Sequence, residues 1–570
     1  MKIGTRGSDL ALWQARHVQG LIRDAAGLDA EIVVIRTAGD RDHQTAFAAM
    51  PGKGFFTKEI EEALRAGTVD IAVHSLKDLQ TVMPDGLVLG AIPERADRRD
   101  VLLTAPSAVD RSRPLRLHEG ARVGTSSARR IAQLRFLRPD LAVENLRGNV
   151  PTRLRKLRDG RYDAILVAAA GLDRLGLDLE GLVAFRLPEV LFVPAPGQGA
   201  LAVQIRDLDA RAHAIVGRLD RLPLRRTVWA EREVLRRLEG GCQLALGAFS
   251  ETTGNGLRLG AFLGTDEPAK PCRIIITGGD DESVVAAVVS YLKCQTQAGA
   301  AVGAVREPPE DRAATGVQSP VRVWITRDAR RAEPFRRRLN SSAFDIAAIP
   351  VFVAVEAGDR EVKRRTMLEL GSYDWIFFTS QITVDEMAHL MHEHGARFGA
   401  QTRLAAVGVK TKAAIERHGW RVDFTADVAD AEAMGEQFLH DVGTRIGRVL
   451  FPCGQAAAAD LEMTLAEGCT GFDRLVCYDI AESPALAQTL PALPDPHAVV
   501  FTSPQAARIL LARRSLPLTT TAVSIGPATT EALRQAGFPI VYEPFERSLE
   551  GTAEVIHGLF PDPSSPSTPS

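Results

Sequence analysis

The stretch IAVHSLKD at residues 71–78 contains the pattern that decides the fold of this chain. A run of apolar residues, typical of a buried strand, ends directly in a loop with a hydroxyl, a cation and a carboxylate. The stretch GTSSARR at residues 124–130 repeats this order, where a strand leads into a helix. In an open α/β sheet, such loops line the ligand crevice at the carboxyl ends of the strands. The sequence therefore predicts an α/β protein whose ligand site is built from these loops.

The same alternation of strands and helices extends through most of the chain. Apolar runs typical of buried strands occur at residues 32–35, 71–73, 164–167, 321–325 and 499–501. Amphipathic helical patterns lie between them, for example at residues 57–65 and 151–157. This order predicts α/β domains with mostly parallel or mixed sheets.

The overall composition limits the class of protein. A chain of 570 residues is too long for one core, so we expect about three to five domains. The net charge of −2 argues against a nucleic-acid binder with a global basic field. The six cysteines lack a CxxC pair, which argues against a disulfide framework or a structural zinc site, and we expect no metal. Neither a signal-peptide pattern nor an apolar run of membrane-spanning length occurs, so we expect a cytoplasmic protein.

Five loops in the first half of the chain combine hydroxyls with cations. They lie at residues 5–8, 52–59, 74–78, 124–130 and 146–153. Arginine binds carboxylates through two parallel hydrogen bonds, and lysine supplies a point charge. So many cationic loops in one region predict a ligand with several carboxylates. Phosphate is the competing ligand, but the chain has no GxxxxGK[ST] loop.

Two residues in this region are candidates for chemistry. Cys242 follows two glycines in EGGCQ at residues 239–243, far from a second cysteine, so its thiol could capture an electrophile covalently. The alternative is a buried cysteine on a glycine turn. Asp78 lies among cations, where it could face a developing positive charge and move protons. Its alternative role is an ion pair with Lys77 or an arginine.

The second half of the chain contains an internal repeat behind a linker. Residues 297–320 are rich in Ala, Gly and Pro and predict a linker that lets the two halves move independently. The order strand, Thr-Ser turn, helix, strand, glycine turn and helix occurs once from residue 373 and again from residue 497. This repeat predicts two similar α/β lobes. The Pro- and Ser-rich tail at residues 561–570 predicts disorder.

Eight ordered motifs across residues 5–243 resemble the porphobilinogen deaminase (hydroxymethylbilane synthase) family. They are TRGSxLALWQA, GKGxFxKE, DIAVHSLKD, VGTSSxRR, LRGNVxTR, AGLDRLG, PAPGQGAL and EGGCQ. The resemblance implies that Cys242 holds a dipyrromethane cofactor through a thioether bond. It also implies that Asp78, with Lys77 beside it, is the catalytic acid and base. Four porphobilinogen molecules would then condense into hydroxymethylbilane with release of ammonia.

The resemblance assigns the remaining residues of these motifs to the carboxylates of the cofactor and the growing chain. These residues are Arg6, Ser8, Lys53, Lys58, Thr125, Ser126, Ser127, Arg129, Arg130, Arg147, Gly148, Arg153 and Arg174. Two departures from the family pattern are visible. Gln80 replaces a proline after HSLKDL, and Leu244 with Ala245 follows GGCQ where a proline is usual. Each loss loosens a loop backbone but leaves the chemical groups in place.

Residues 321–557 resemble the uroporphyrinogen-III synthase family. The motifs are TRDARRAEPFRRRL, YDWIFFTS, AAVGxxT, FTSPQAAR and SIGPATTEALRQAG. This resemblance implies closure of hydroxymethylbilane to uroporphyrinogen III with inversion of the last ring, without a metal or an organic cofactor. Tyr478 matches a tyrosine that assists loss of the terminal hydroxyl, although it could equally cap a core strand. The expected substrate-binding hydroxyls are Ser380, Thr411, Thr502, Ser503 and Thr529.

Two substitutions in the second half depart from that pattern. Lys410 replaces a small residue, and Cys453 replaces an arginine that would bind a carboxylate. Two alternatives to the bifunctional enzyme therefore stay open. The second half could be a degenerate binding module, or the whole chain could be a two-lobed anion-binding protein without catalysis.

The resemblances predict a fold and a set of domain boundaries. The first half is expected to have two α/β lobes like those of periplasmic binding proteins and a small α+β domain, and the second half two Rossmann- or flavodoxin-like α/β lobes. The expected boundaries are 1–95 with 195–215, 96–194, 216–297 with the cofactor cysteine, linker 298–320, 321–354 with 482–560, 355–481, and tail 561–570. We expect a monomer that binds small-molecule substrates, without a nucleic-acid or membrane partner.

Overall fold

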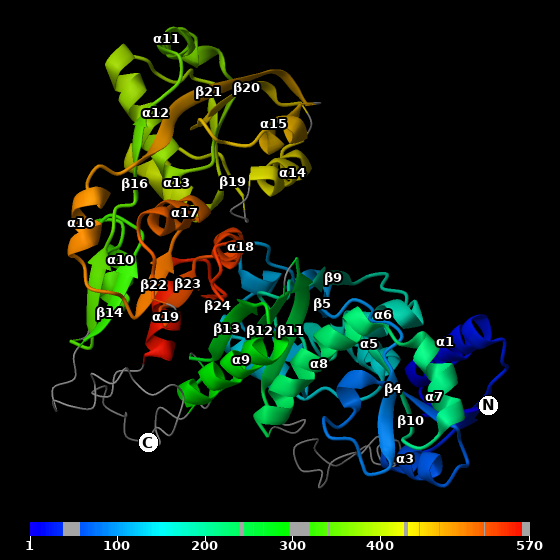
Figure 1. Cartoon of the computed structure of the whole chain (residues 1–570). Helices are drawn as coiled ribbons and strands as arrows, with labels where there is room; N and C mark the ends of the chain where they lie inside the picture. The colour runs from blue at the N-terminus through cyan, green and yellow to red at the C-terminus, as the bar shows by residue number, and fades with distance from the viewer. Residues whose placement is uncertain are drawn as a thin grey trace. The chain divides into compact units, whose positions relative to one another are not determined.

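The computed structural model describes residues 1–37, 57–239, 244–296 and 320–560, apart from positions 255, 266, 269, 340–341, 427–430, 444, 467 and 518. Cys242, Lys53, the linker up to residue 319 and the tail lie outside the described residues. The chain divides into two units, Met1–Ala348 with Pro494–Ser570 and Ile349–Leu493. The described part contains helices and mixed sheets throughout, which confirms the α/β class (Figure 1).

The first sheet has the strand order β2-β1-β3-β10-β4. Its strands are β1 (Lys2–Thr5), β2 (Glu31–Val34), β3 (Ile71–Ser75), β4 (Leu87–Ala91) and β10 (Leu201–Arg206). Strand β1 is parallel to β2 and β3, whereas β10 is antiparallel to β3 and β4. Because side chains alternate along β3, Ile71 and Val73 pack in one core with helix α1 (Asp9–Ala26). Ala72 packs in the other core, with α3 (Lys58–Arg65).

The second sheet has the order β7-β6-β8-β5-β9. Its strands are β5 (Asp100–Thr104), β6 (Arg122–Gly124), β7 (Ala142–Glu144), β8 (Ala164–Ala168) and β9 (Val183–Arg186). Helices α4 (Ala128–Leu137), α5 (Val150–Arg158) and α6 (Ala169–Leu175) connect or follow these strands. Residues 92–99 and 187–200 connect this sheet to the first one. Helix α7 (Ala210–Val216) follows β10 in the chain.

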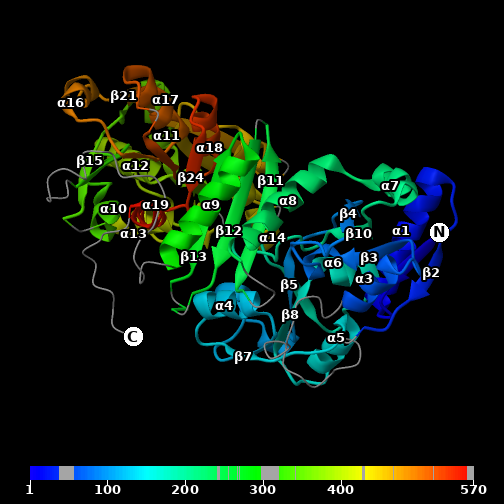
Figure 2. The same ribbon diagram turned by 60° about the horizontal axis from the view of Figure 1, so that its bottom comes forward.

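The third sheet has eight strands in the order β11-β12-β13-β24-β23-β22-β14-β15. They are β11 (Leu246–Thr253), β12 (Gly256–Leu263), β13 (Cys272–Gly278), β14 (Val321–Ile325), β15 (Phe344–Ala348), β22 (Ala498–Phe501), β23 (Thr521–Ser524) and β24 (Ile540–Glu543). The helices of this region are α8 (Leu222–Arg237), α9 (Asp281–Thr296), α10 (Glu333–Arg338), α17 (Pro504–Arg513), α18 (Pro527–Gln535) and α19 (Leu549–Leu559). Figure 2 shows α9 lying over strands β12 and β13.

The second unit contains a six-stranded sheet of order β16-β21-β20-β17-β18-β19. Its strands are β16 (Phe352–Glu356), β17 (Trp375–Phe378), β18 (Arg403–Ala406), β19 (Phe424–Thr425), β20 (Gly447–Gly454) and β21 (Cys469–Glu482). The accompanying helices are α11 (Arg360–Leu368), α12 (Gln381–His394), α13 (Gly408–Arg417), α14 (Ala431–Asp441), α15 (Asp460–Leu465) and α16 (Leu486–Ala492).

The structure confirms the predicted repeat. The elements β17, α12, β18 and α13 follow one another in the second unit, and β22, α17, β23 and α18 follow in the same order in the first. Ser380 and Ser503 begin the corresponding helices, each accepting a hydrogen bond from the backbone N–H three residues on. Within the described parts of the chain, no helix is long and apolar enough to cross a membrane, and no cluster of three metal-binding side chains occurs.

Candidate functional site

The loop after β3 presents Asp78 to solvent on a firmly held backbone. Its first residues form a short 3₁₀ helix, Leu76–Asp78, in which Leu76 is fully buried. The N–H of Leu76 donates to the carbonyl of Ala200 at 3.0 Å, and Gln14 Nε2 donates to Ser75 Oγ at 2.8 Å. Asp78 itself is exposed. The fold therefore fixes the position of this carboxylate while leaving it accessible to a ligand.

Arg232 on α8 holds the same loop from the other side. Its guanidinium donates to the carbonyls of Leu76 at 3.1 Å, Leu79 at 3.2 Å and Gln80 at 2.5 Å. Burial lowers the pKa of Arg232 to about 10, so it stays protonated at neutral pH. Arg232 thus restrains the backbone where the sequence lacks the usual proline. Sequence analysis missed it, because it lies in an ordinary amphipathic helix outside the motifs.

Arg129 and Arg130 lie at the start of α4 and share the buried carboxylate of Asp100 on β5. Arg129 Nη1 lies 2.7 Å from Asp100 Oδ2, and Arg130 Nη2 lies 2.6 Å from Asp100 Oδ1. Burial disfavours the ionised form of Asp100, but the two guanidinium groups outweigh it and hold the pKa of Asp100 well below its ordinary value. The two arginines are therefore held in place by the protein itself. Arg129 Nε is buried without a hydrogen-bond partner among the described residues.

Gln198 connects this ion cluster to the loop of Asp78. Its side-chain amide donates to Asp100 Oδ1 at 3.1 Å and to the carbonyl of Arg98 at 2.8 Å. Its oxygen accepts from Lys77 Nζ at 3.4 Å. Gln198 lies in the PAPGQGAL motif. The sequence therefore marked this segment, but it assigned no role to Gln198 itself.

The charges around Asp78 converge from three loops. Burial lowers the pKa of Lys77 to about 8, with Asp78 opposing the shift and Arg130 adding to it. Burial also lowers the pKa of Arg153 to about 10, with Arg130 lowering it further and Asp78 opposing. The Asp78 carboxylate thus acts electrostatically on both cations, and so does Arg130 from a third loop.

The glycine of the LRGN loop is required by its geometry. Gly148 has φ = 111°, and a Cβ there would lie 2.8 Å from Thr152 Cγ2. Its carbonyl accepts from Arg153 Nε at 2.8 Å, which orients that side chain. Arg147 is half-buried beside it, and its carbonyl accepts from Lys156 Nζ at 3.0 Å.

Arg174 occupies the junction between the first and second sheets. Its guanidinium lies over the Trp13 ring, 5.5 Å from the centroid, and donates to the carbonyl of Gly199 at 2.8 Å and to Glu94 at 3.1 Å. Burial lowers the pKa of Arg174, and its Nε has no hydrogen-bond partner among the residues that the structure describes. Arg6 lies close enough to buried His74 to contribute, after burial, to lowering the pKa of that imidazole to about 4.

The remaining predicted residues of the first half have mainly backbone contacts. Ser8 caps α1 by accepting from the N–H of Ala11 at 3.3 Å, and Ser126 Oγ donates to the carbonyl of Leu146 at 2.9 Å. Thr125 is buried and accepts from the N–H of Ser127 at 3.3 Å. Lys58 is exposed at the start of α3.

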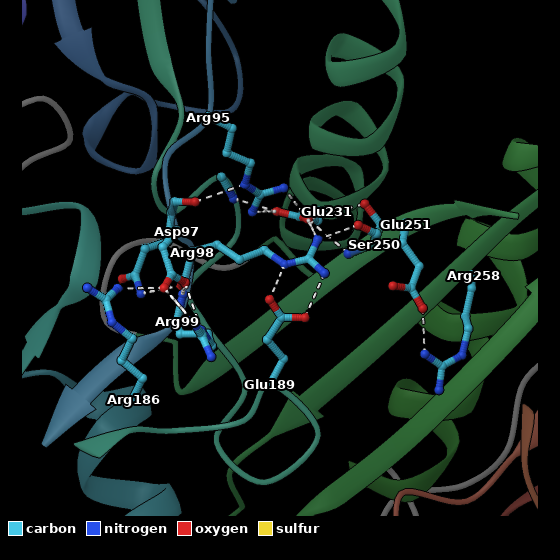
Figure 3. A network of polar contacts seen from close by, with 12 residues as sticks. Arg95, Asp97, Arg98, Arg99, Arg186, Glu189, Glu231, Ser250, Glu251 and Arg258 are labelled. Carbon is cyan, nitrogen blue, oxygen red and sulfur yellow. Dashed lines mark hydrogen bonds and ion pairs between the residues drawn. The ribbon is translucent and has the colours of Figure 1, made fainter. Parts of the chain in front are cut away.

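A second ionic network joins the connecting segments to the third sheet (Figure 3). Arg95 forms two hydrogen bonds to fully buried Glu231, at 2.8 and 2.9 Å. Arg98 binds Glu189 at 2.5 and 2.6 Å and the carbonyl of Ser250 at 2.5 Å. Glu231 also accepts from the N–H of Ser250 at 2.9 Å. Arg95, Arg98, Glu189, Glu231 and Ser250 therefore form one connected network.

In the second half, the predicted residues fall in both units. Thr502 Oγ1 donates to the carbonyl of Thr326 at 2.9 Å, and Thr529 is buried in the first turn of α18. In the other unit, Thr411 is buried in α13. Tyr478 is 8% exposed in a core cluster, where its ring would contact a Cβ at Gly454 at 3.0 Å. The side chain thus lies in a core position.

The site of the first half suits a ligand with several carboxylates and polar N–H groups. Buried, unpartnered N–H groups of Arg129 and Arg174 need an acceptor, and an acidic side chain can supply one. Lys77 and Arg153 add positive charge, while the Asp78 carboxylate can accept hydrogen bonds from pyrrole N–H groups. These residues fit a dipyrromethane with acetate and propionate arms.

Comparisons with known proteins agree with this site. Residues 1–214 match the family model "Porphobilinogen deaminase, dipyromethane cofactor binding domain", and residues 225–287 match "Porphobilinogen deaminase, C-terminal domain". Residues 333–554 match "Uroporphyrinogen-III synthase HemD". A porphobilinogen deaminase of Nitratidesulfovibrio vulgaris strain DP4 is 48% identical over 44% of this chain and 79% of that protein. One of Brevibacillus brevis is 42% identical over 52% of this chain and 94% of that protein.

Among solved structures, a mutant uroporphyrinogen III synthase of the thermophilic bacterium Thermus thermophilus is similar to 42% of this chain and 98% of its own, with 17% identity and a TM-score of 0.31. The family matches confirm both predicted resemblances. The chain belongs to the porphobilinogen deaminase family, and a uroporphyrinogen-III synthase region follows its deaminase region.

Proposed function

We propose that this bifunctional enzyme of tetrapyrrole biosynthesis condenses four porphobilinogen molecules into hydroxymethylbilane and then closes that product to uroporphyrinogen III. The observation that carries the first step is the exposed carboxylate of Asp78, whose charge acts on Lys77 and Arg153 and whose loop is held by Gln198 and Arg232. The second step rests on the match of residues 333–554 to the synthase family, which disfavours a degenerate binding module.

The cofactor of the first step is a dipyrromethane. When bound, it supplies the pyrrole carbon that begins the chain. We propose Cys242, outside the described residues, as its attachment point. Arg129 and Arg174 each have a buried N–H that would bind its acidic arms, with Arg130 and Arg153 adding charge. The binding residues are thus cations already oriented by protein contacts, which lowers the cost of ordering them on binding.

Asp78 and Lys77 would divide the proton transfers. Loss of ammonia from porphobilinogen leaves positive charge on a pyrrole nitrogen, and the Asp78 carboxylate would stabilise it and take up the proton lost after ring coupling. Lys77, with a pKa of about 8, can donate a proton near neutral pH and be reprotonated from solvent. Both transfers use side chains of the same short loop.

For the second step we propose that hydroxyls on both repeats bind the acidic arms of hydroxymethylbilane. Ser380 and Ser503 stand at helix N-termini, which favour anions. Tyr478 would donate a proton to the departing hydroxyl. We also propose the finer fold assignment of two binding-protein-like lobes and a small domain, followed by two flavodoxin-like lobes, and a monomer in the cytoplasm.

Separation of the uroporphyrinogen isomers formed from porphobilinogen tests this assignment. We expect isomer III from the intact chain and a shift toward isomer I from Tyr478→Phe. Isomer I alone from the intact chain would show that the second half does not catalyse ring closure. An unchanged isomer ratio for Tyr478→Phe would assign that residue to the core only.

A further inference from the structure

The deaminase region and the synthase region share one β-sheet. Strand β13, the last strand of the deaminase region, pairs antiparallel with β24, the last strand of the synthase region. The register pairs Ile275 with Glu543 and continues through Gly278 with Ile540. We propose that the first half binds the second by this strand addition, so that residues 216–296 and the lobe of β14, β22, β23 and β24 form one rigid body independent of the linker.

A buried ion pair accompanies the strand pairing. Arg258 on β12 lies 2.9 Å from Glu543 Oε1 and 2.6 Å from Glu251 Oε1, and Figure 3 shows the second contact. Glu543 is 1% exposed and also accepts from Thr530 Oγ1 at 2.9 Å. Removing either partner of a buried, hydrogen-bonded pair leaves an uncompensated charge, so this contact is strongly specific. It crosses from the deaminase region to the synthase region.

Aromatic and apolar contacts extend the same interface. Phe249 and Phe545 meet edge to face with centroids 6.3 Å apart, and the Arg273 guanidinium lies over the Phe545 ring at 4.9 Å. Buried residues of both regions form one hydrophobic cluster, which includes Ile276 from the first half and Val523 from the second. A shared apolar core is typical of a permanent interface, and the buried pair of Arg258 and Glu543 adds specificity to it.

The helices next to the sheet approach closely as well. A Cβ at Gly558 on α19 would lie 2.6 Å from Tyr291 Cε2 on α9, so glycine is needed for this packing. Without the second half, β13 would expose an unpaired strand edge, which promotes aggregation. The occupant of that edge is therefore the chain's own second half. The linker composition predicted independent movement, whereas strand addition makes the linker dispensable for the association.

Cleavage of the linker tests this inference without reference to activity. A specific protease site is inserted between residues 300 and 318 of the full chain, the protein is cleaved, and the two fragments are followed by size-exclusion chromatography at micromolar concentration. We expect the fragments to elute together as one complex. Separate elution, or precipitation of either fragment after cleavage, would overturn the inference.

Charge reversal tests the role of the ion pair in the same cleaved protein. We expect Glu543→Arg to raise the dissociation constant of the fragments at least about tenfold, and the double variant Arg258→Glu with Glu543→Arg to restore much of the affinity. Glu333→Arg is the control, because Glu333 forms an exposed pair with Arg337 inside the second half. A Glu543→Arg complex as tight as the control would contradict the proposed pair. If the intact chain fails to form isomer III, the proposed second step is wrong, but the result of the fragment experiment does not change. The two proposals can therefore fail separately.

Discussion

At the scale of single residues, the account depends on the Asp78 carboxylate. Its loop is held by Ala200, Gln14 and Arg232, so replacing the carboxylate by an amide should leave the fold intact. We expect Asp78→Asn to lower kcat for porphobilinogen consumption by about 10²- to 10⁴-fold, which is typical of a lost acid–base group. Asp85→Asn, an exposed residue in the next loop, is the control. Activity within about twofold of that control would remove Asp78 from the mechanism.

Lys77 should link stability to pH. Its pKa is about 8 in the folded protein, against an ordinary value of 10.5 in the unfolded chain. Between these values the unfolded chain binds the extra proton, so this group makes the free energy of unfolding rise with pH, by up to about 1.4 kcal/mol per unit. Below pH 8 both states are protonated and the effect is constant. We expect the free energy of unfolding of the wild type minus that of Lys77→Met, measured in urea, to rise from pH 8 to 10. If this difference stays constant over that range, the pKa of Lys77 is not shifted in the folded protein.

At the scale of elements, Asp100 joins β5 to the start of α4. It is the shared carboxylate of Arg129 and Arg130, and all three side chains are buried. We expect Asp100→Asn to lower the free energy of unfolding by about 3–5 kcal/mol, because two buried guanidinium groups lose their counter-ion. Asp140→Asn removes an ion pair with Arg138 whose carboxylate is more exposed, and should cost less. If the two variants lose the same free energy of unfolding in chemical denaturation, Asp100 does not stabilise the buried arginines as proposed.

Helix α8 holds the loop of Asp78 through Arg232. We expect Arg232→Met to lower kcat by about ten- to a hundredfold and to speed hydrogen exchange in residues 76–80, while the pH profile keeps its shape. Arg236→Met, on the same helix, removes an ion pair with Glu233 that does not touch the loop, and it is the control. If exchange in the loop does not change relative to this control, Arg232 does not restrain the loop.

Local patterns predicted the elements, whereas the contacts behind the site required the structure. The apolar run at residues 71–73 and the helix signals at residues 57–65 and 151–157 are local, and β3, α3 and α5 confirm them. Asp100, Gln198 and Arg232 were missed because their partners lie far away in sequence. For example, Arg232 holds a carbonyl 156 residues away. The available signal for Asp100 was a carboxylate directly before the apolar run VLL at residues 101–103.

At the scale of the whole molecule, two enzymatic regions occupy one chain. The repeat of Thr-Ser turns predicted the similar order of elements in the second half, and the structure confirms it. The pairing of β13 with β24 could not be predicted, because strand partners such as Thr277 and Val541, which are 264 residues apart, leave no local pattern and the linker composition suggested separate bodies.

Intact mass of the purified chain tests the central claim most directly, since the claim is covalent attachment of the primer at Cys242. We expect the protein to be heavier than its 61.6 kDa sequence by the mass of a dipyrromethane, and we expect Cys242→Ser to lack this increment and the deaminase activity. A wild-type mass equal to that of the bare chain in active protein, or a Cys242→Ser variant that consumes porphobilinogen at the wild-type rate, would contradict the account.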